Sequence, residues 1–372
     1  MIALLSLAML GVESTAPAAA LPRITVQNGR FVNSATRKEF HPVGFNYIRL
    51  RRTEPEPGNL WHDTLNPAHY SADRTERMFA DLERRGFNIV RVFLDPLTGT
   101  GFVERAAAEE LSAGYLRSLF DFLRRARAHH VYVMLCFCYL PDRTAYRVGP
   151  PPEHIEGSNQ EYLHPGMVRS RAQWMADVCS AIRKHDPALL STVFAYELEN
   201  ESHFIATQAP FSLTSGTVQW NGRTYDAASP DDLQRLADDA IVEAINAAHD
   251  AVRKVDRQAL VGASVFTFRA VGRSGPGKIR EDKTDDPRFP ARPLAIARSK
   301  SAYVDVHFYP TDDTMLDADY RSIEFPALKV ACEKAGKPRM VGEIGAFKFA
   351  YKDLPTAVQA MSRSLRRLRE DG

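Results

Sequence analysis

The stretch TVFAYELENE, residues 192–201, ends an apolar segment with a cluster of acidic residues. A second stretch, PRMVGEIG at residues 338–345, ends another apolar segment with Glu343. Short segments rich in valine, phenylalanine and isoleucine, with turn-forming residues beyond them, are typical of buried parallel strands. A carboxylate at the end of such a strand is costly unless the protein uses it. Glu201 and Glu343 are therefore candidate functional residues that a closed parallel sheet would bring together.

Strand-like and helix-like segments alternate along the rest of the chain. Further strands are expected at residues 41–47, 88–94, 131–138, 259–266 and 303–308. Apolar residues spaced for one face of a helix occur at residues 116–123, 233–245 and 358–368. Alternation of this kind predicts a parallel α/β sheet, and no glycine-rich dinucleotide-binding turn follows the first strand. We therefore expect a (β/α)8 TIM barrel rather than a Rossmann sheet.

Two Asn-Gly turns predict β-hairpins outside the barrel strands. The first lies in RITVQNGRFV, residues 23–32, and is expected to plug the bottom of the barrel. The second lies in TVQWNGRTY, residues 217–225, in the long segment after the fourth strand, on the active-site face. Its Trp220 is expected to be exposed at the rim, where it would stack on a sugar or pack across the hairpin.

The two ends of the sequence give further expectations. The apolar stretch 2–12 and the small residues 16–20 resemble a signal peptide over residues 1–20, so we expect a secreted or periplasmic protein with its catalytic domain at residues 21–372. After the last helix the sequence stops at Gly372, where an eighth strand is expected. Seven strands would leave two unpaired edges, so a C-terminally truncated barrel is our hypothesis.

Composition excludes several classes of function. The formal net charge is +2, and no basic run is interleaved with aromatic residues, so nucleic acid is not an expected partner. No segment after the N-terminus is long and apolar enough for a membrane helix. The four cysteines show no metal-binding spacing, and we interpret them as buried apolar residues. Neither a metal nor an organic cofactor is expected.

Two carboxylates are the residues that glycosidic bond cleavage requires. In a retaining enzyme one carboxylic acid protonates the leaving oxygen, and a second carboxylate, roughly 5–5.5 Å away, attacks the sugar. The acid must keep its proton, which burial or a neighbouring negative charge would achieve. The nucleophile must stay ionised, and Arg91, inside the second expected strand, is a candidate to stabilise it.

Four motifs, in this order, resemble a known family. The chain is similar to the (β/α)8 glycoside hydrolases of clan A, and most closely to glycoside hydrolase family 5, the cellulase and mannanase family. The resemblance covers nearly the whole chain from residue 21 onward. It rests on GFNIVR (86–91), FAYELENE (194–201), HFY (307–309) and GEIG (342–345), with NGRF (28–31) and VGFN (43–46) also similar to family members.

The resemblance implies a role for each matching residue. Glu201 would be the general acid/base and Glu343 the nucleophile. Asn200 would bind the sugar 2-hydroxyl, Tyr309 would hydrogen-bond the nucleophile, and His307 would line the site near the acid/base. Arg91 would brace Glu343. The implied substrate is a β-linked polysaccharide or oligosaccharide, and mannan, β-1,4-glucan, β-1,3-glucan and small exo-cleaved glycosides all fit these motifs.

Departures from the family pattern keep other hypotheses open. Many members carry a histidine at the end of the third strand, where this chain reads Cys136-Phe137-Cys138-Tyr139, and the tryptophan that the eighth strand usually supplies is absent. A non-catalytic carbohydrate-binding protein on this scaffold is therefore the main alternative. A metal-dependent barrel hydrolase would need several histidine and aspartate ligands at strand ends, a pattern that is missing. Glu197 is expected to be structural, and Glu199 would either raise the pKa of Glu201 or face a cation.

Overall fold

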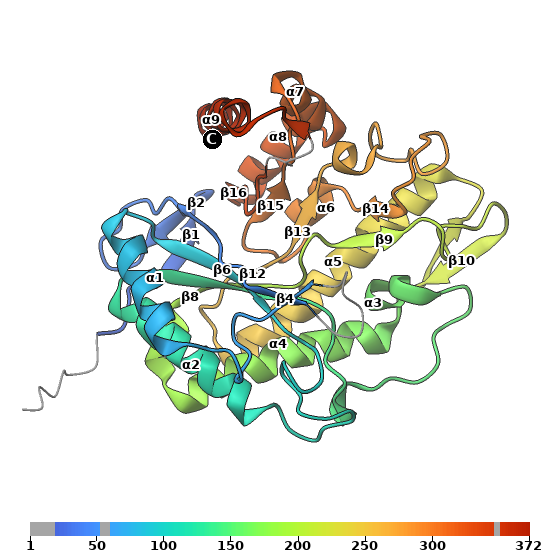
Figure 1. Cartoon of the computed structure of the whole chain (residues 1–372). Coiled ribbons are helices and arrows are strands. Elements are labelled where there is room, and N and C mark those ends of the chain that lie inside the picture. The colour runs from blue at the N-terminus through green and yellow to red at the C-terminus, as the bar shows by residue number, and fades with distance from the viewer. Residues whose placement is uncertain (1–18, 53–59, 346–349) are drawn as a thin grey trace, which may run out of the picture.

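A computed structural model describes residues 19–52, 60–345 and 350–372 of the chain (Figure 1). Its centre is a curved set of parallel strands with helices around it. These strands are β3 (Gly44–Asn46), β6 (Ile89–Leu94), β7 (Tyr132–Phe137), β8 (Val193–Glu197), β12 (Val261–Gly262), β13 (Ser264–Phe266), β15 (Val304–His307) and β16 (Arg339–Met340). They fall in the segments predicted from the sequence. The signal peptide predicted at residues 1–20 lies almost wholly outside the described residues.

The sheet is parallel throughout but is not a closed barrel. The strand order is β3-β6-β7-β8-β12 in one part and β13-β15-β16 in the other. β12 and β13 are consecutive pieces of one predicted strand, interrupted at Ala263, and each piece pairs with a different part of the sheet. Within the described residues β3 and β16 do not pair with each other, so both are edges. The closed (β/α)8 barrel is therefore not seen, because seven strand positions do not complete the ring.

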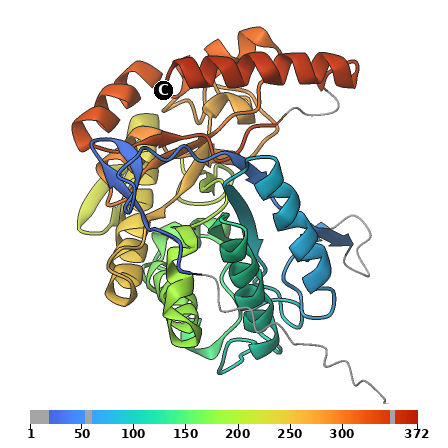
Figure 2. The ribbon, with the colours of Figure 1, turned by 90° about the vertical axis from the view of Figure 1, so that its left-hand side faces the viewer.

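Helices cover the outside of the sheet (Figure 2). They are α1 (Ala72–Arg84), α2 (Ala113–Ala128), α3 (Gln160–Leu163), α4 (Pro165–His185), α5 (Pro230–Val255), α6 (Pro293–Arg298), α7 (Asp313–Ser322), α8 (Phe325–Ala335) and α9 (Leu354–Glu370). The remaining strands form short antiparallel pairs: β1 (Ile24–Gln27) with β2 (Arg30–Asn33), β4 (Leu50–Arg52) with β5 (Leu60–His62), β9 (His203–Ile205) with β14 (Arg288–Pro290), and β10 (Thr217–Trp220) with β11 (Arg223–Asp226). In the described part of the chain, no helix combines the length and the apolar character that crossing a bilayer requires.

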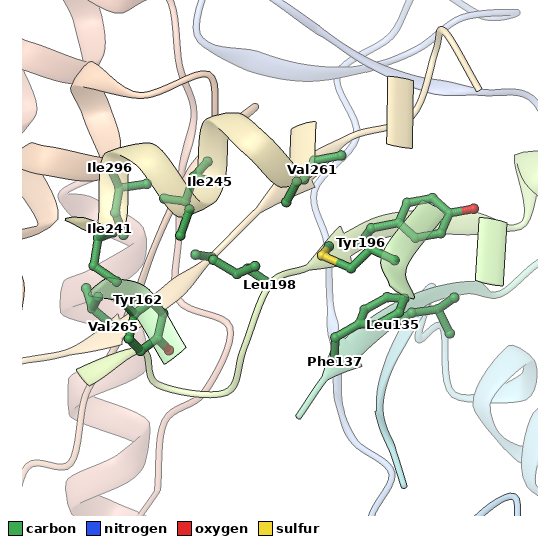
Figure 3. Packing of buried hydrophobic residues seen from close by; sticks show 14 of the residues in the cluster. Leu135, Phe137, Tyr162, Tyr196, Leu198, Ile241, Ile245, Val261, Val265 and Ile296 are labelled. Carbon is green, nitrogen blue, oxygen red and sulfur yellow. The ribbon is translucent and has the colours of Figure 1, made fainter. Parts of the chain in front are cut away.

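Helix α5 shows how local sequence places the core. The Ser229 side chain accepts a hydrogen bond from the amide of Asp232, and Pro230 occupies the first turn, as expected of a helix start. Its apolar stripe then faces the sheet: Ile241 and Ile245 pack in the same core cluster as residues of β8 and β12, as Figure 3 shows. The predicted amphipathic helix at residues 233–245 is confirmed. The four cysteines are buried and free, as predicted.

The first predicted hairpin forms and covers the beginnings of the strands. Asn28 and Gly29 have φ values of 51° and 73°, the left-handed conformation that a two-residue hairpin turn requires. Phe31 of β2 packs against Phe194 near the start of β8, with ring centroids 5.1 Å apart. It also lies 5.9 Å from the ring of Tyr303, just before β15. The hairpin therefore buries aromatic side chains at the end of the sheet where the strands begin.

We predict that Gly44→Ala destabilises the protein, because β3 approaches β6 too closely for a side chain. A Cβ at Gly44 would lie 1.8 Å from the carbonyl oxygen of Ile89, its partner in β6. Overpacking of this kind typically costs about 1–3 kcal/mol, and backbone offers no easy relaxation. The free energy of unfolding in urea measures the effect. Gly149→Ala is the control, since a Cβ there meets nothing within 4 Å; equal midpoints for both variants would contradict the prediction.

Candidate active site

The two predicted glutamates meet at the carboxyl ends of the parallel strands. Glu201 follows β8 and Glu343 follows β16. One carboxylate oxygen from each and a ring nitrogen of His307 all lie within 4.8 Å of one another. The Tyr309 hydroxyl contacts Oε1 of Glu201 and donates to Oε1 of Glu343 at 2.7 Å. The structure thus brings together four residues that the sequence singled out from three different segments.

The Glu201 side chain is placed by an unusual backbone conformation. Its φ is 55°, in the left-handed region that non-glycine residues seldom adopt. Ser264 of β13 stabilises this turn: its hydroxyl accepts the Glu201 amide at 3.0 Å and donates to the Glu199 carbonyl at 3.2 Å. Strained backbone held by surrounding structure often marks a functional site. The turn directs Glu201 toward His307 instead of continuing the strand.

Donors from two strands and from the segment after β15 surround Glu343. The Asn46 side chain, at the end of β3, donates to Oε2 at 2.7 Å. Nη1 of Arg91, from β6, donates to the same oxygen at 3.3 Å, and Tyr309 donates to the other oxygen. The Glu343 side chain is 24% exposed, so one side of the carboxylate is accessible. Three donors therefore fix the position and orientation of the Glu343 carboxylate.

Arg91 is buried and makes its shortest contact with Glu197. Nε donates to Oε2 of Glu197 at 2.6 Å, and both side chains are almost fully excluded from solvent. Nη2 donates to Oδ1 of Asn200 at 2.9 Å and approaches Sγ of Cys136 at 3.4 Å. The sequence analysis predicted Glu343 as the partner of Arg91. In the structure Arg91 contacts both Glu197 and Glu343. Glu197 is structural, as expected, and Cys136 occupies the third-strand position without disrupting this network.

The protonation of Glu201 differs from the expected state. Burial would raise the pKa of Glu201, but hydrogen bonds from His307 and Tyr309 and the charge of Arg288 outweigh it and lower that pKa. Conversely, burial would lower the pKa of His307, but its hydrogen bond to Glu201 and the charge of Asp305 raise it. His307 Nδ1 lies 3.1 Å from Oε1 of Glu201. The pKa of Glu201 is thus shifted opposite to the direction expected of a general acid, and the contact favours the protonated form of His307.

A second set of ionisable groups lies beneath the glutamates. Glu197, Asp305 and His307 are fully buried, and one potential ligand atom from each lies within 4.8 Å of the others. Burial raises the pKa of Asp305 to about 7, against the opposing charges of His307 and Arg91. Two carboxylates and an imidazole could in principle hold a metal ion. Here the guanidinium of Arg91 already provides the cation for Glu197, so the cluster is accounted for as an ion-pair network.

Two site residues escaped the sequence analysis. Asn46 ends the first strand, and its position directly after an apolar segment was the signal that could have given it a role. Arg288 comes from β14, in an irregular segment, and its Nη1 lies 3.8 Å from Oε2 of Glu201. Asp286 pairs with Arg288 at 2.7 Å and orients it. No pattern in the sequence marks this arginine, because β14 reaches the site only through its antiparallel pairing with β9.

The predicted rim tryptophan is not at the surface. The second hairpin forms as expected, but Trp220 is only 8% exposed, and its indole nitrogen donates to the Leu163 carbonyl at 2.9 Å. The prediction of an exposed, sugar-stacking Trp220 is wrong, because the alternation of β10 turns this side chain into the core. Glu199 faces a cation, the other alternative: it lies 2.8 Å from Arg171.

Comparison with known proteins places the fold. The sequence matches no protein-family model and no curated protein. Among solved structures, the chain is similar to an exo-β-1,4-mannosidase from Opitutaceae bacterium strain TAV5, with a TM-score of 0.54 and 16% identity. That alignment covers 94% of this chain and 53% of the mannosidase, so the chain spans about half the length of that protein.

Two further structures give the same result. Endo-glycoceramidase II from Rhodococcus sp. aligns with a TM-score of 0.54 and 18% identity, over 94% of this chain and 73% of that one. An endocellulase from Pyrococcus horikoshii aligns with a TM-score of 0.51 and 15% identity, over 95% and 88%. Identities this low establish the fold alone. The chain therefore shares its α/β fold with proteins that are named as glycosidases.

We predict that Arg91→Met destabilises the protein by about 3–5 kcal/mol, because it leaves the carboxylate of Glu197 buried without its partner. The free energy of unfolding in urea at neutral pH measures the loss. Arg85→Met is the matched control, since Arg85 pairs with Asp81 on the surface of α1 and such pairs contribute less than about 1 kcal/mol. A loss in Arg91→Met no larger than in this control would contradict the assignment of a buried ion pair.

Proposed function

We propose that the protein is a retaining glycoside hydrolase that cleaves β-glycosidic bonds of a mannan- or glucan-type glycan. The observation that carries the proposal is the pair of glutamates at the strand ends, with carboxylate oxygens within 4.8 Å of each other and a shared contact to Tyr309. This short separation fits retaining enzymes, whose carboxyl groups lie roughly 5–5.5 Å apart, better than inverting enzymes. The glycosidase names of the structural neighbours support the same class.

Glu343 is the proposed nucleophile. It attacks the anomeric carbon and forms a covalent glycosyl-enzyme, while the leaving oxygen takes a proton from Glu201. Asn46, Arg91 and Tyr309 hold and orient the Glu343 carboxylate before the attack. Water then enters, gives its proton to Glu201 and releases the sugar, so the configuration at the anomeric carbon is retained.

Glu201 is the proposed acid/base, with His307 as the source of its proton. In the free protein the hydrogen bond from His307 Nδ1 holds Glu201 as a carboxylate. A bound sugar displaces water from Glu201, and loss of hydration disfavours the charged form. The proton then moves along the 3.1 Å contact from the imidazole to Glu201 Oε1 and on to the leaving oxygen. Asn200, fixed by Arg91 at 2.9 Å, is placed to bind a sugar hydroxyl.

We also propose that the enzyme is exported from the cell. The predicted signal peptide at residues 1–20 suits a secreted or periplasmic enzyme, because polymeric glycans do not enter cells intact. A β-linked polysaccharide or oligosaccharide is the proposed partner, with catalysis by the two carboxylates rather than by a cofactor. Sequencing the N-terminus of the mature protein tests this part: a start near residue 21 supports export, and an intact residue 1 argues against it.

We predict that Glu343→Ala and Glu201→Ala each lower turnover by at least about a thousandfold, because each removes one of the two groups that the reaction needs. The assay is release of reducing sugar from β-mannan, β-1,4-glucan, β-1,3-glucan and xylan. Glu243→Ala, at an exposed position of α5, is the matched control and should retain full activity. The polymer that the unmodified protein cleaves identifies the substrate class.

Rescue by azide distinguishes the role of the nucleophile from that of the acid/base. A small anion can occupy the space left in Glu343→Ala and attack the sugar in its place, which yields a glycosyl azide of inverted configuration from a substrate with a good leaving group. We expect this rescue for Glu343→Ala. Full activity of Glu343→Ala without azide would overturn the proposal, and loss of native activity in a chelator would instead indicate a metal-dependent hydrolase.

A binding protein without hydrolysis is the second candidate. The observation in its favour is that the pKa of Glu201 is lowered, which is opposite to the shift that suits a general acid. Titration calorimetry with mannan and glucan oligosaccharides, followed by analysis of the mixture for products, distinguishes the two. Binding with no product over days would favour the second candidate, and measurable turnover would exclude it.

A further inference from the structure

Asp305 lies directly below both glutamates, yet the reaction proposed above gives it no part. It belongs to β15, and its side chain is fully buried. Oδ1 accepts the backbone N–H of Gly342 at 2.6 Å. Oδ2 is buried and has no hydrogen-bond partner among the described residues. Burying a carboxylate inside a strand costs free energy. The contacts that Asp305 makes toward Glu343 and toward Glu201 therefore need an explanation.

Toward Glu343, Asp305 holds the peptide that precedes the nucleophile. The strand pairing of β15 with β16 reaches Asp305 and Met340, and beyond it the Phe308 amide donates to the Glu343 carbonyl at 3.1 Å. The bond from the Gly342 amide to Asp305 lies between these contacts and adds a further attachment. A Cβ at Gly342 would lie 2.1 Å from Oδ2 of Asp305, so this position accepts only glycine while the carboxylate is in place. Gly342 is covalently joined to Glu343, and fixing its amide therefore fixes where the Glu343 side chain starts.

Toward Glu201, Asp305 acts through the imidazole between them. Asp305 and His307 are two residues apart on one strand and so project from the same face. His307 Nδ1 lies 3.1 Å from Glu201, while Nε2 lies 3.9 Å from Oδ1 of Asp305. Nε2 is buried, and within the described residues it has no hydrogen-bond partner. Nε2 therefore faces Asp305 across 3.9 Å, a distance at which the charges attract each other without a hydrogen bond.

We propose that Asp305 is a positioning residue for both glutamates: it anchors Glu343 through the Gly342 amide, and its charge holds the imidazole of His307 in place against Glu201. Its effect on turnover rests on the function proposed above. Its effect on His307 does not, and can be measured in a protein with no known substrate.

The charges around His307 determine whether the Asp305→Asn variant raises or lowers the pKa of His307. Carboxylates outnumber cations around the ring, and removing one of them disfavours the imidazolium. The Asp305→Asn variant therefore lowers the pKa of His307, so that the protonated ring is lost at a lower pH than in the unmodified protein. The groups that face His307 are Glu197, Glu201, Asp305 and Glu343, the guanidinium of Arg91 and the phenol of Tyr309.

The direct test is a pH titration of the His307 ring signals by NMR in the unmodified protein and in Asp305→Asn, with the signals assigned through His307→Gln. Asparagine keeps an acceptor for the Gly342 amide and removes only the charge. We expect the pKa of His307 to fall by about one unit or more. Asp319→Asn is the matched control, a buried aspartate of α7 that accepts from Thr267 and should leave His307 unchanged. No shift in Asp305→Asn overturns the proposal.

Kinetic measurements test separately the effect of Asp305 on Glu343 and its effect on His307. We expect Asp305→Asn to lower kcat about tenfold with little change in KM, and to move the alkaline limb of the pH profile to lower pH, because the proton donor is lost earlier. Asp305→Ala also removes the acceptor of the Gly342 amide, so it should lose more activity than Asp305→Asn. Equal losses in both variants would overturn the anchoring of Glu343, and an unmoved alkaline limb would overturn the role toward His307.

Three further outcomes distinguish a failure of this inference from a failure of the proposed function. If Asp305→Asn does not fold, Gly342→Ala serves instead, because its methyl group displaces the Asp305 carboxylate without removing the charge; an unchanged His307 titration in that variant counts against the proposal. If the unmodified protein cleaves no glycan, the proposed function fails, and the NMR titration still decides the role of Asp305. If glycan cleavage is normal in Asp305→Asn, only the inference fails.

Discussion

The buried contact between Arg91 and Glu197 is the interaction on which the rest of the site depends. It joins β6 to β8 inside the sheet at 2.6 Å, where neither charge has access to water. From that fixed point the same guanidinium reaches Asn200 and Glu343, which belong to opposite parts of the sheet. The planar guanidinium has five donors in a fixed fork and so reaches acceptors on several strands, whereas a lysine has only three donors on a compact ammonium group. The relative position of the two glutamates follows from this network.

The contacts of Glu201 also explain why its pKa is lowered. His307, Tyr309 and Arg288 all stabilise the Glu201 carboxylate, and together they outweigh the effect of burial. The same contacts favour a proton on the neighbouring imidazole of His307. In the proposed reaction, substrate binding changes this balance, because a sugar would replace the water around Glu201 while His307 stays buried. Proton transfer and substrate binding are thereby linked.

Much of the fold could be predicted from the sequence, because the spacing of apolar residues and the residues that end a strand are local features of the chain. The seven strand segments, the amphipathic helix at residues 233–245 and both Asn-Gly hairpins are observed. Glu201 and Glu343 could be found because carboxylates directly after apolar strands have few structural uses, whereas His307 and Tyr309 were singled out by the resemblance of HFY to the family motif. Trp220 could not be placed correctly, since which face of β10 points inward depends on the tertiary packing around Leu163. Arg288 and the pairing of Arg91 with Glu197 depend on contacts between distant segments, which no local pattern encodes.

The most direct test of the central claim is to trap the covalent intermediate. A 2-deoxy-2-fluoro glycoside with a good leaving group slows both steps of a retaining reaction and lets the glycosyl-enzyme accumulate, so its mass can be measured on the intact protein and on its peptides. Our account predicts one added sugar, attached to the peptide that contains Glu343 and absent from Glu343→Ala. An adduct on another residue, or turnover of natural substrate with inverted configuration and no adduct, would contradict it.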